Sequence, residues 1–327
     1  MNYNLKTLFK DRNILIIGDI MIDSYINGNV NRISPEAPVP VVNLVNNEYR
    51  LGGAANVAMN IKSLGANPII CSAIGDDNNG RLLINLLLDN NIKTNNIILS
   101  DERITTNKTR IVGNNQQLLR IDDEITEDIS ETLENIIYDK VEYLIKNNSI
   151  DAVIFEDYNK GLLTKELIVK IIDLCNDNNI ITTVDPKKNN FLTYRNVTLF
   201  KPNLKELNDG LNLKIDLVNQ ESFETAVSKL EVVLMNRISL ITLSEKGLFI
   251  KEDNKKYYVN TTPKKIFDVS GAGDTVIAIA TLGLISNLPI DFIGYISNLG
   301  ASIVCQQMGT ASIDIDDLIN EIKIIEL

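Results

Sequence analysis

The sequence predicts an α/β fold with a mainly parallel sheet, helices on both faces and a small β lid. Beyond residue 122, apolar runs of strand length alternate with amphipathic runs of helix length. Such alternation is typical of a parallel sheet covered by helices on both sides. Four of the predicted strands end in polar side chains, and the carboxyl edge of such a sheet is where sites are built. Before residue 122, several strand-like runs follow one another without helices, which predicts the separate lid.

Composition narrows the possible functions. The chain has 327 residues, 44% of them apolar, so it can bury a core as one large domain. We expect a single domain over residues 1–327, with lid strands inserted at about 20–48 and 97–121. A net charge of -11 argues against a nucleic-acid binder or a membrane-surface protein. The absence of histidine excludes a Ser-His-Asp triad, a histidine zinc site and a histidine base.

Several features predict a cytoplasmic location. The first twelve residues show no secretory signal, and no apolar run is long enough to span a membrane. Cys71, Cys175 and Cys305 are far apart in the sequence and have no metal-type spacing. We therefore expect buried thiols in a reducing compartment.

The first predicted strand covers residues 13–18 and ends at Asp19, with Asp23 four residues later. Acids just past a strand end can bind a ligand, although a turn or cap is the alternative for each. Residues 20–45 then include three prolines within 35–40, which exclude a helix or a central strand. This segment predicts short strands of a lid or edge sheet.

Gly52 and Gly53 precede a run of small residues that predicts a helix ending near Gly65. Paired glycines let a ligand or another segment lie against a helix start. Asn56, on the first turn, can hydrogen-bond a sugar hydroxyl or serve as a local cap. A strand at 69–74 and a helix at 80–88 follow. Three more strand-like runs, at 97–99, 109–112 and 117–121, predict an antiparallel layer joined to the proline-rich segment.

The remaining chain has a regular strand–helix rhythm. Helices are predicted at 130–146, 164–177, 221–233, 292–307 and 315–325. Strands are predicted at 152–155, 180–184, 197–200 and 239–243, with a hairpin at 248–251 and 256–259. The polar residues near these strand ends are Asp157, Lys160, Asp185, Lys187, Asn203, Glu206 and Ser244.

A β-prone run leads to residues 268–275, Asp-Val-Ser-Gly-Ala-Gly-Asp-Thr, where a loop becomes an apolar helix. A helix start offers unpaired N–H groups and a partial positive charge, which together suit a phosphate. Asp274 would face the hydroxyl that attacks the phosphate, and the helix dipole should keep it ionised. Glycines also open buried helices for packing reasons alone. The dinucleotide fingerprint is excluded because Val276 replaces its third glycine, and no Gly-Lys-Ser or Gly-Lys-Thr of a P-loop occurs.

Phosphoryl transfer depends on positioning and charge neutralisation more than on covalent chemistry. A loop of backbone N–H groups, one or two lysines, acids for Mg²⁺ and one acid beside the hydroxyl would suffice. The predicted strand ends supply each of these groups.

Three segments resemble signatures of the ribokinase (PfkB) family of carbohydrate kinases. They are residues 268–275, residues 52–56 and the Asn-x-x-Glu motif at 203–206. The resemblance implies ATP as co-substrate, Mg²⁺, and Asp274 as catalytic base. It also implies an anion hole from the backbone amides of Gly271, Ala272, Gly273 and Asp274.

The same resemblance assigns the other site residues. Asn203, Leu204, Lys205 and Glu206 would arrange ATP, with Glu206 acting indirectly on Mg²⁺. The nucleotide would also contact Ser244, Gly247 and Asn298, and we add Lys187 as a candidate of our own for ATP. Sugar hydroxyls would be held by Asp19, Asp23, Gly52, Gly53 and Asn56. Asp268 matches a position that in many relatives helps to bind a monovalent cation such as K⁺.

Segments 32–41, 115–120, 157–161 and 185–187 resemble the branch of the family that acts on D-glycero-β-D-manno-heptose 7-phosphate. This implies phosphorylation of the anomeric hydroxyl to the 1,7-bisphosphate, on the way to ADP-heptose and the lipopolysaccharide core. Candidates for substrate contacts in or beside these segments are Arg120, Asp157, Lys160 and Asp185, with Lys187 for an anionic group of substrate or ATP. The lid sheets of such kinases commonly pair, so a homodimer through the lid is expected.

The adenylyl-transfer half of the bifunctional relatives depends on a His-x-Gly-His motif, and this chain has no histidine. A separate adenylyltransferase is therefore expected. Three alternatives remain. They are another sugar kinase of the family, acting on fructose phosphate or ribose; a non-catalytic sugar-phosphate or nucleotide sensor; and a dehydrogenase, which the missing third glycine disfavours.

Overall fold

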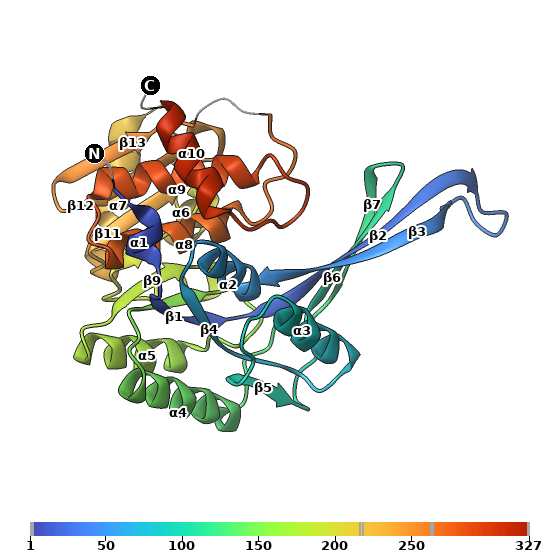
Figure 1. The fold of residues 1–327 in the computed structure, drawn as a ribbon, viewed down its shortest axis with the longest axis horizontal. Helices are drawn as coiled ribbons and strands as arrows, with labels where there is room; N and C mark the ends of the chain where they lie inside the picture. The colour runs from blue at the N-terminus through green and yellow to red at the C-terminus, as the bar shows by residue number, and fades with distance from the viewer. Residues whose placement is uncertain (1–2, 216, 218, 262–264, 326–327) are drawn as a thin grey trace.

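The computed structural model describes residues 3–215, 217, 219–261 and 265–325. Within them the chain forms a nine-stranded sheet and a four-stranded sheet (Figure 1). The larger sheet consists, in spatial order, of β13 (Lys255–Val259), β12 (Leu248–Glu252), β11 (Ile238–Thr242), β10 (Leu199–Phe200), β9 (Ile181–Asp185), β8 (Ala152–Glu156), β1 (Asn13–Gly18), β4 (Asn67–Gly75) and β5 (Ile97–Ser100). The strands from β11 to β5 pair in parallel, and β12 and β13 add an antiparallel edge. The predicted α/β class is confirmed.

Helices cover both faces of this sheet. One face carries α1 (Leu5–Phe9), α2 (Ala54–Ser63), α3 (Asn78–Asp89), α8 (Ala272–Ile285), α9 (Ile290–Val304) and α10 (Ile315–Ile325). The other carries α4 (Glu131–Asn147), α5 (Lys165–Asp177), α6 (Leu204–Leu211) and α7 (Gln220–Leu234). Strand β1 shows how one sequence supplies two cores. Its Ile14 and Ile16 pack on the first face and Leu15 and Ile17 on the second, because successive side chains of a strand point to opposite sides.

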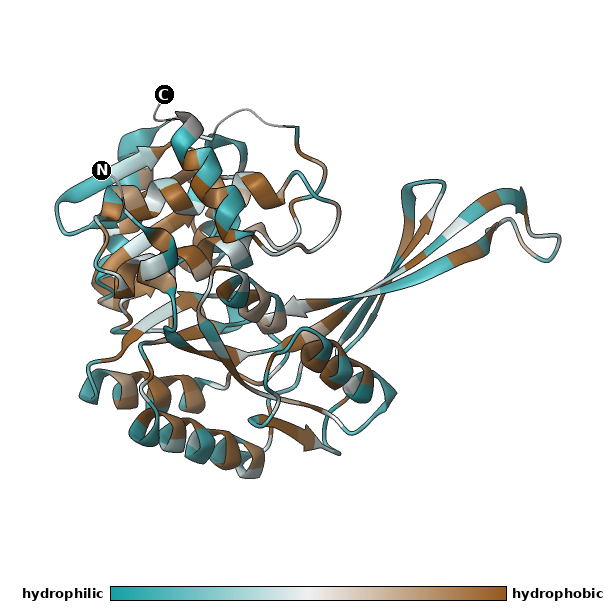
Figure 2. Ribbon diagram, in the orientation of Figure 1, coloured by the Kyte–Doolittle hydropathy of each residue, from teal (hydrophilic) through white to brown (hydrophobic). Residues whose placement is uncertain are grey.

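Helix α8 is buried on nearly all sides, and every residue from Asp274 to Leu284 is buried. An all-round apolar helix belongs inside a protein, and α8 is accordingly among the most apolar helices in Figure 2. It lies against α2, α9 and strand β9. A buried hydrogen bond of 2.7 Å between the hydroxyls of Thr183 and Thr281 joins it to β9. The first turn of α8 is thereby fixed at the carboxyl edge of the sheet.

The four-stranded sheet is the lid, and it extends away from the body (Figure 1). It is built in the order β3 (Pro40–Gly53), β2 (Ile20–Ile33), β6 (Asn107–Gly113) and β7 (Gln116–Asp123). β2 pairs antiparallel with β3 and parallel with β6, so the lid is mixed and not simply antiparallel.

Two predictions about the lid were wrong. Its first two strands are 14 residues long, not short, because the prolines lie in the turn between them or, like Pro40, at a strand start. The run at 97–100 belongs to the large sheet, where β5 pairs in parallel with β4. Strand periodicity shows that a run is extended but carries no information about which sheet it joins.

Other sequence predictions hold to within a few residues at most element ends, while the short helices α1 and α6 were missed. No strand precedes the turn at 268 within the described residues 265–267, and the rest of that expected run falls partly outside them, at 262–264. Cys71 and Cys175 are buried as expected, whereas Cys305 is partly exposed. Within the part of the chain that the structure describes, no helix is long and apolar enough to cross a membrane.

Candidate active site

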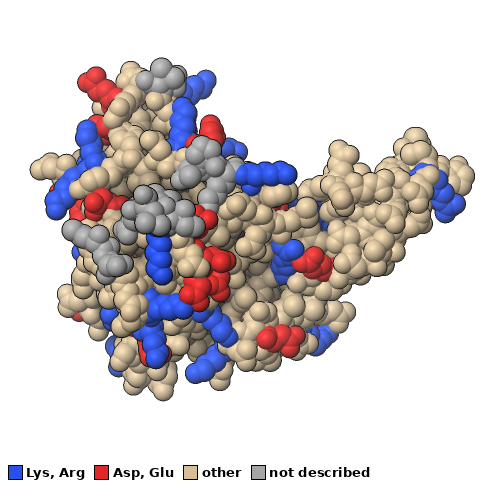
Figure 3. All heavy atoms as spheres, turned by 45° about the horizontal axis from the view of Figure 1, so that its top comes forward, with Lys and Arg blue, Asp and Glu red and all other residues tan. Residues whose placement is uncertain are grey.

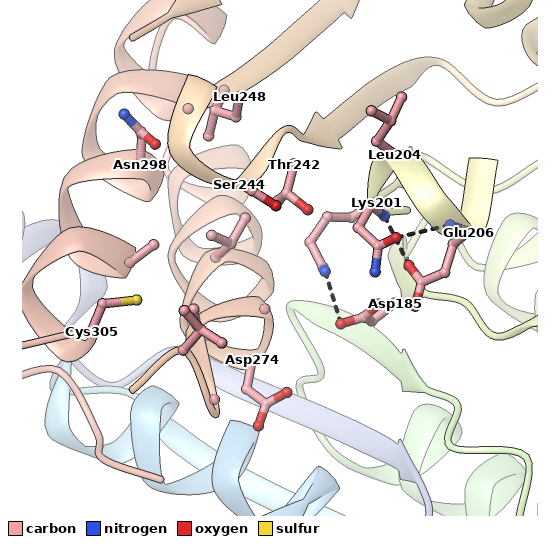
Figure 4. A pocket seen from close by; sticks show the side chains of 18 of the residues that line it. Asp185, Lys201, Leu204, Glu206, Thr242, Ser244, Leu248, Asp274, Asn298 and Cys305 are labelled. Atoms are coloured by element: carbon pink, nitrogen blue, oxygen red, sulfur yellow. Dashed lines mark hydrogen bonds and ion pairs between the residues drawn. The ribbon is translucent and has the colours of Figure 1, made fainter. Parts of the chain in front are cut away.

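A cavity of about 820 Å³ lies between the start of α8, helix α9 and the carboxyl ends of β9, β10 and β11. In Figure 4, Asn298, Leu248 and Cys305 lie toward one side, and Lys201, Asp185 and Glu206 lie toward the other. The predicted site residues that the structure brings together here are Asp185, Lys187, Asn203, Leu204, Lys205, Glu206, Ser244, Gly247, Gly271, Ala272, Gly273, Asp274 and Asn298.

The glycine turn opens helix α8 and is shaped by its lack of side chains. Gly271 is the N-cap residue and has a left-handed backbone, with φ +81°. A Cβ atom at Gly271 would lie 2.8 Å from Nδ2 of Asn56, and one at Gly273 would lie 3.3 Å from Oδ2 of Asp185. Any larger residue would therefore displace the polar groups around the turn.

The predicted anion hole is smaller than expected. The Ala272 N–H donates to the carbonyl of Val269 at 3.2 Å and is already satisfied. Among the described residues, the N–H groups of Gly271, Gly273 and Asp274 find no backbone acceptor, as is usual at the start of a helix. These three amides can bind an anion at the positive end of the helix.

Asp274 lies on the first turn and is only 3% exposed. One carboxylate oxygen accepts a hydrogen bond of 2.6 Å from Asn56, and the other accepts one of 3.1 Å from the Tyr158 hydroxyl. Burial raises the pKa of Asp274 to about 6 and outweighs both hydrogen bonds. The helix dipole alone was expected to keep this group ionised, but burial has the larger effect. Asp274 is still mostly ionised at neutral pH and can accept a proton.

Tyr158 lies in the branch-like segment 157–161 but was not among the predicted site residues. Burial and the nearby Asp274 raise the pKa of the Tyr158 phenol, so it keeps its proton and donates to Asp274. The ammonium group of Lys187 lies 5.1 Å from the centre of its ring, a cation–π contact. A tyrosine following a strand-end acid has no pattern that distinguishes this position from a packing residue.

Two lysines bring positive charge to the cavity. The buried Lys201 lies 2.8 Å from Asp185, and Lys187 lies 2.8 Å from Glu206 and 3.7 Å from Asp185. Burial alone would lower the pKa of Lys187, but Asp185 and Glu206 raise it, so it stays charged. Lys201 directly follows strand β10, and its position at a strand end was the only signal that could have indicated it.

The Asn-x-x-Glu motif forms a capping box at the start of α6. The Asn203 side chain accepts from the Glu206 N–H, and the Glu206 carboxylate accepts from the Asn203 N–H, both at 2.8 Å. The other Glu206 oxygen binds Lys187. Because both oxygens have partners, an indirect effect of Glu206 on a metal ion fits this geometry better than direct ligation.

The predicted sugar-binding residues lie where the lid joins the body. Asp19 accepts hydrogen bonds from the N–H groups of Tyr158 and Lys160 at 3.0 and 3.1 Å. Burial, followed by the neighbouring Asp157, raises the pKa of Asp19 to about 6. Asn56 links this region directly to Asp274.

Asp23 lies inside β2 rather than in a turn. Its carboxylate binds Arg110 on β6 at 2.6 Å, and a Cβ at Gly52 would lie 2.7 Å from it. Gly53 caps α2 with φ +59°. Arg110 is therefore a second residue that the sequence analysis missed, because the pairing of β6 with β2 brings together positions 87 residues apart.

Three residues predicted to contact the substrate have protein partners in the structure. Asp157 turns inward, where it accepts from Tyr194 at 2.8 Å, Asn190 at 3.2 Å and the Asn159 N–H at 2.7 Å, so it stabilises the loop after β8. Lys160 pairs with Glu124 at 2.7 Å. Arg120 pairs with Asp122 on β7, and its side chain is 52% exposed.

Asp268 accepts hydrogen bonds from the N–H groups of Ser270 and Gly309, both at 2.9 Å. Burial would raise the pKa of Asp268, but these bonds lower it. Arg50 of the lid donates to the carbonyls of Met308 and Thr310 in the same loop. Binding of a monovalent cation at Asp268 stays a prediction.

The sequence pattern of pfkB family carbohydrate kinases matches residues 11–317. The chain belongs to this family. It is a phosphotransferase that acts on a sugar hydroxyl, and kinases of this family use ATP and Mg²⁺. The lining of the cavity suits ATP and Mg²⁺. Two lysines lie at one side and apolar residues such as Leu248 at the other, and at the glycine turn a Cβ atom would crowd the neighbouring polar groups.

Curated relatives include the bifunctional protein HldE of Sulfurimonas denitrificans, 39% identical over 93% of this chain and 63% of the relative. The bifunctional protein HldE of Helicobacter pylori is 38% identical over 94% of this chain and 65% of the relative. The chain thus spans slightly less than two thirds of the length of these relatives.

Solved structures show the same fold at low sequence identity. Phosphofructokinase-2 from Escherichia coli in complex with fructose-6-phosphate aligns with a TM-score of 0.78 at 17% identity, covering 97% of this chain and 100% of that chain. Ribokinase from Arabidopsis thaliana, complexed with ribose and ATP, aligns with a TM-score of 0.74 at 15% identity, covering 96% and 99%. The ribokinase-like fold predicted from the sequence motifs is confirmed.

Replacing the acid at the helix start tests its role as base. We expect Asp274→Asn to lower kcat by about 10²- to 10⁴-fold, the usual contribution of a general base. The amide can still accept from Asn56 and donate to Tyr158, so the ATP dissociation constant should change by less than about threefold. Turnover and calorimetric ATP binding measure the two effects. Retained kcat would contradict the assignment of Asp274 as base.

The pH dependence of the reaction tests the hydrogen bond from Tyr158. Activity should fall as pH decreases through the pKa of Asp274, about 6 in the metal-free protein, because the protonated acid cannot accept a proton. Since the Tyr158 hydroxyl stabilises the ionised form, Tyr158→Phe should move the acidic limb of kcat/KM to higher pH. Tyr194→Phe, which removes a buried hydroxyl from Asp157 instead, is the matched control. An unmoved limb in Tyr158→Phe would count against this contact.

Proposed function

We propose that the protein phosphorylates the anomeric hydroxyl of D-glycero-β-D-manno-heptose 7-phosphate, with ATP as donor, to the 1,7-bisphosphate. The main support for a kinase site is the position of Asp274. This acid, with a pKa of about 6, lies at a glycine-rich helix start and lines the cavity. The choice of heptose 7-phosphate is supported by the branch-like segments and by 38–39% identity to bifunctional HldE proteins.

The chemistry follows from the positions of the side chains. Asp274 takes the proton of the sugar hydroxyl as its oxygen attacks the γ-phosphorus of ATP. The new O–P bond forms while the bond to the ADP oxygen breaks, and the product leaves as a phosphate ester. The amides of Gly273 and Asp274 offset the charge of the transferred group, and Lys201 and Lys187 offset that of the ATP phosphates. Bound Mg²⁺ would supply further neutralisation of phosphate charge, positioned through Glu206 and Asn203.

Three basic side chains of the lid are our candidates for binding the 7-phosphate, although each is paired with an acid in the structure: Lys108 with Glu124, Arg110 with Asp23 and Arg120 with Asp122. Strand pairing places Lys108 beside Asp23 and Arg110 beside Tyr25, with Arg120 directly opposite Arg110. These side chains share the face of the lid on which Asp23 lies. Arg110 is 15% exposed, and its bond to Asp23 directs its guanidinium toward the proposed sugar site. We therefore place the 7-phosphate nearer Arg110 and Lys108 than the exposed Arg120.

Kinetics with competing sugars test this function. The kcat/KM for heptose 7-phosphate should exceed those for fructose phosphates and for ribose. Arg110→Gln should lower it by about tenfold to a hundredfold, the effect of losing a charge-assisted hydrogen bond, with little change in the KM for ATP. Arg120→Gln should have a smaller effect, and the exposed Arg81→Gln is the control. A preference for a neutral sugar would reject the proposal.

We also propose that two copies pair through the lid. The face opposite Asp23 carries the exposed apolar side chains Leu44, Tyr49, Leu119 and Ile121. In Figure 3 the outer part of the lid is largely uncharged. An exposed apolar sheet face of this kind is typical of an interaction surface, and a second copy would supply the same face.

Light scattering after size exclusion tests the pairing. The double variant Leu119→Lys/Ile121→Lys should be monomeric, because two buried charges would oppose association. Val232→Lys replaces a still more exposed apolar residue on α7, away from the lid, and should leave the dimer intact. A monomeric unmodified protein would contradict the proposal.

A further inference from the structure

Arg50 connects the lid to the body of the protein. It lies on β3 directly opposite Asp23 of β2, so the two side chains share one face of the lid. Its guanidinium donates hydrogen bonds to the backbone carbonyls of Met308 and Thr310, in the loop that follows α9. Neither the proposed proton transfer nor the proposed phosphate contacts use this side chain, so its position requires another explanation.

Two contacts within the lid fix the direction of the Arg50 guanidinium. Its Nε bonds the carboxylate of Glu48 at 2.6 Å. Its Cζ lies 5.2 Å from the centre of the Tyr25 ring, a cation–π contact. The Arg50 side chain is 27% exposed, so water screens these contacts only in part. A paired and stacked arginine is pre-organised to bind oxygen atoms, here the carbonyls of the loop.

The loop that this arginine holds runs beside the glycine turn. Asp268 joins the two segments, because its carboxylate oxygens accept from the N–H groups of Gly309 in the loop and Ser270 in the turn, both at 2.9 Å. Thr310 also lies against the turn, since a Cβ atom at Gly271 would be 3.7 Å from its Cα. A displacement of the loop would therefore displace the turn.

Gly309 allows the arginine to come this close to the loop. Its backbone has φ +73°, in the left-handed region that glycine adopts without strain. A Cβ atom there would overlap Nη1 of Arg50 and would lie 2.9 Å from the hydroxyl of Tyr25. The contact between lid and loop thus depends on a position without a side chain.

We propose that Arg50 is a positioning residue for phosphoryl transfer. From the lid it holds the loop at 308–310, and through Gly309 and Asp268 it fixes the glycine turn, whose amides would bind the transferred phosphate. Donors that are already in place stabilise a developing charge without reorganising, and a misplacement of about 1 Å can cost about a hundredfold in rate. The proposal rests on the proposed role of the glycine turn, but not on which sugar is phosphorylated.

Arg50 acts through the loop and not as a ligand of the substrate. Its Nε and Nη1 are bonded to Glu48 and to the loop carbonyls, whereas Arg110 is the arginine that binds Asp23 at the proposed sugar site. Removing Arg50 should therefore leave the binding of ATP and sugar largely unchanged and should reduce the stabilisation of the transition state.

Kinetics of Arg50 variants test this inference, with the sugar that the unmodified protein phosphorylates fastest and at one fixed K⁺ concentration. Arg50→Gln should lower kcat and kcat/KM for ATP together by about tenfold, the usual effect of losing one charge-assisted hydrogen bond in the transition state. Arg50→Lys keeps the charge but not the planar fork and should lose less. The matched control is Arg12→Gln. Arg12, just before β1, also bonds an acid, Asp151, and a backbone carbonyl, that of Leu8, and its loss should leave kcat unchanged.

Two further measurements separate positioning from general stability. Arg50→Ala leaves space for a guanidinium ion, so guanidinium chloride well below denaturing concentrations should raise its kcat several-fold, but not that of Arg12→Gln. In the double variant Arg50→Gln/Asp268→Asn, the two losses in kcat should be less than additive, because both substitutions break one chain of contacts.

Several results would overturn the proposal. Arg50→Gln could retain the kcat of the unmodified protein, or could raise a KM at unchanged kcat, which would make Arg50 a substrate ligand. An equal loss of kcat in Arg12→Gln, or no rescue of Arg50→Ala by guanidinium, would indicate a purely structural role. If Arg50→Ala does not fold, the ranking of Arg50→Lys above Arg50→Gln decides instead. Absence of turnover in the unmodified protein with every sugar would contradict the proposed function itself, and this inference with it.

Discussion

The burial of helix α8 is the constraint on which the site depends. Its sequence is almost wholly apolar from Val276 onward, so it can only lie between the sheet and the helices of one face. That position fixes the first turn at the carboxyl edge of β8 and β9 and removes Asp274 from water. Desolvation then gives the carboxylate a pKa suited to proton transfer, which an exposed aspartate would not have.

Burial also affects the other charged groups around the first turn of α8. Acids end β8 and β9, and lysines lie just beyond them, so the sheet edge combines opposite charges at short range. Burying these charges is costly unless they are paired, and the pairs fix the side chains in place. Positioned charges of this kind stabilise a developing charge without having to reorganise, which phosphoryl transfer requires.

The sequence predicted what depends on local pattern. The strand–helix rhythm, the glycine turn and the polar strand ends all appear in the structure near their expected places. Predictions failed where pairing between distant segments decides the outcome. The run at 97–100 joined the large sheet, and Arg110 reached Asp23 only through the β2–β6 pairing.

The sequence also did not predict the direction in which neighbouring loop side chains point. Asp157 and Tyr158 follow the same strand, yet the acid turns into the core and the tyrosine turns to Asp274. The direction of each side chain follows from the backbone after β8, where Asn159 adopts a left-handed conformation. Similarly, Asn203 and Glu206 were predicted as ligand residues alone, but the structure shows that they also form the capping box of α6.

The long lid strands have a consequence for how the substrate is enclosed. β2 begins directly after Asp19, and β3 ends at Gly53, immediately before α2 and Asn56. The hairpin is therefore rooted directly beside the residues proposed to bind the sugar, with no linker between them. β2 and β3 pair along nearly their whole length, from Ile20–Gly53 at the root to Ile33–Pro40 at the tip. A movement of the lid as one unit would therefore also move Asp23, which is itself part of β2.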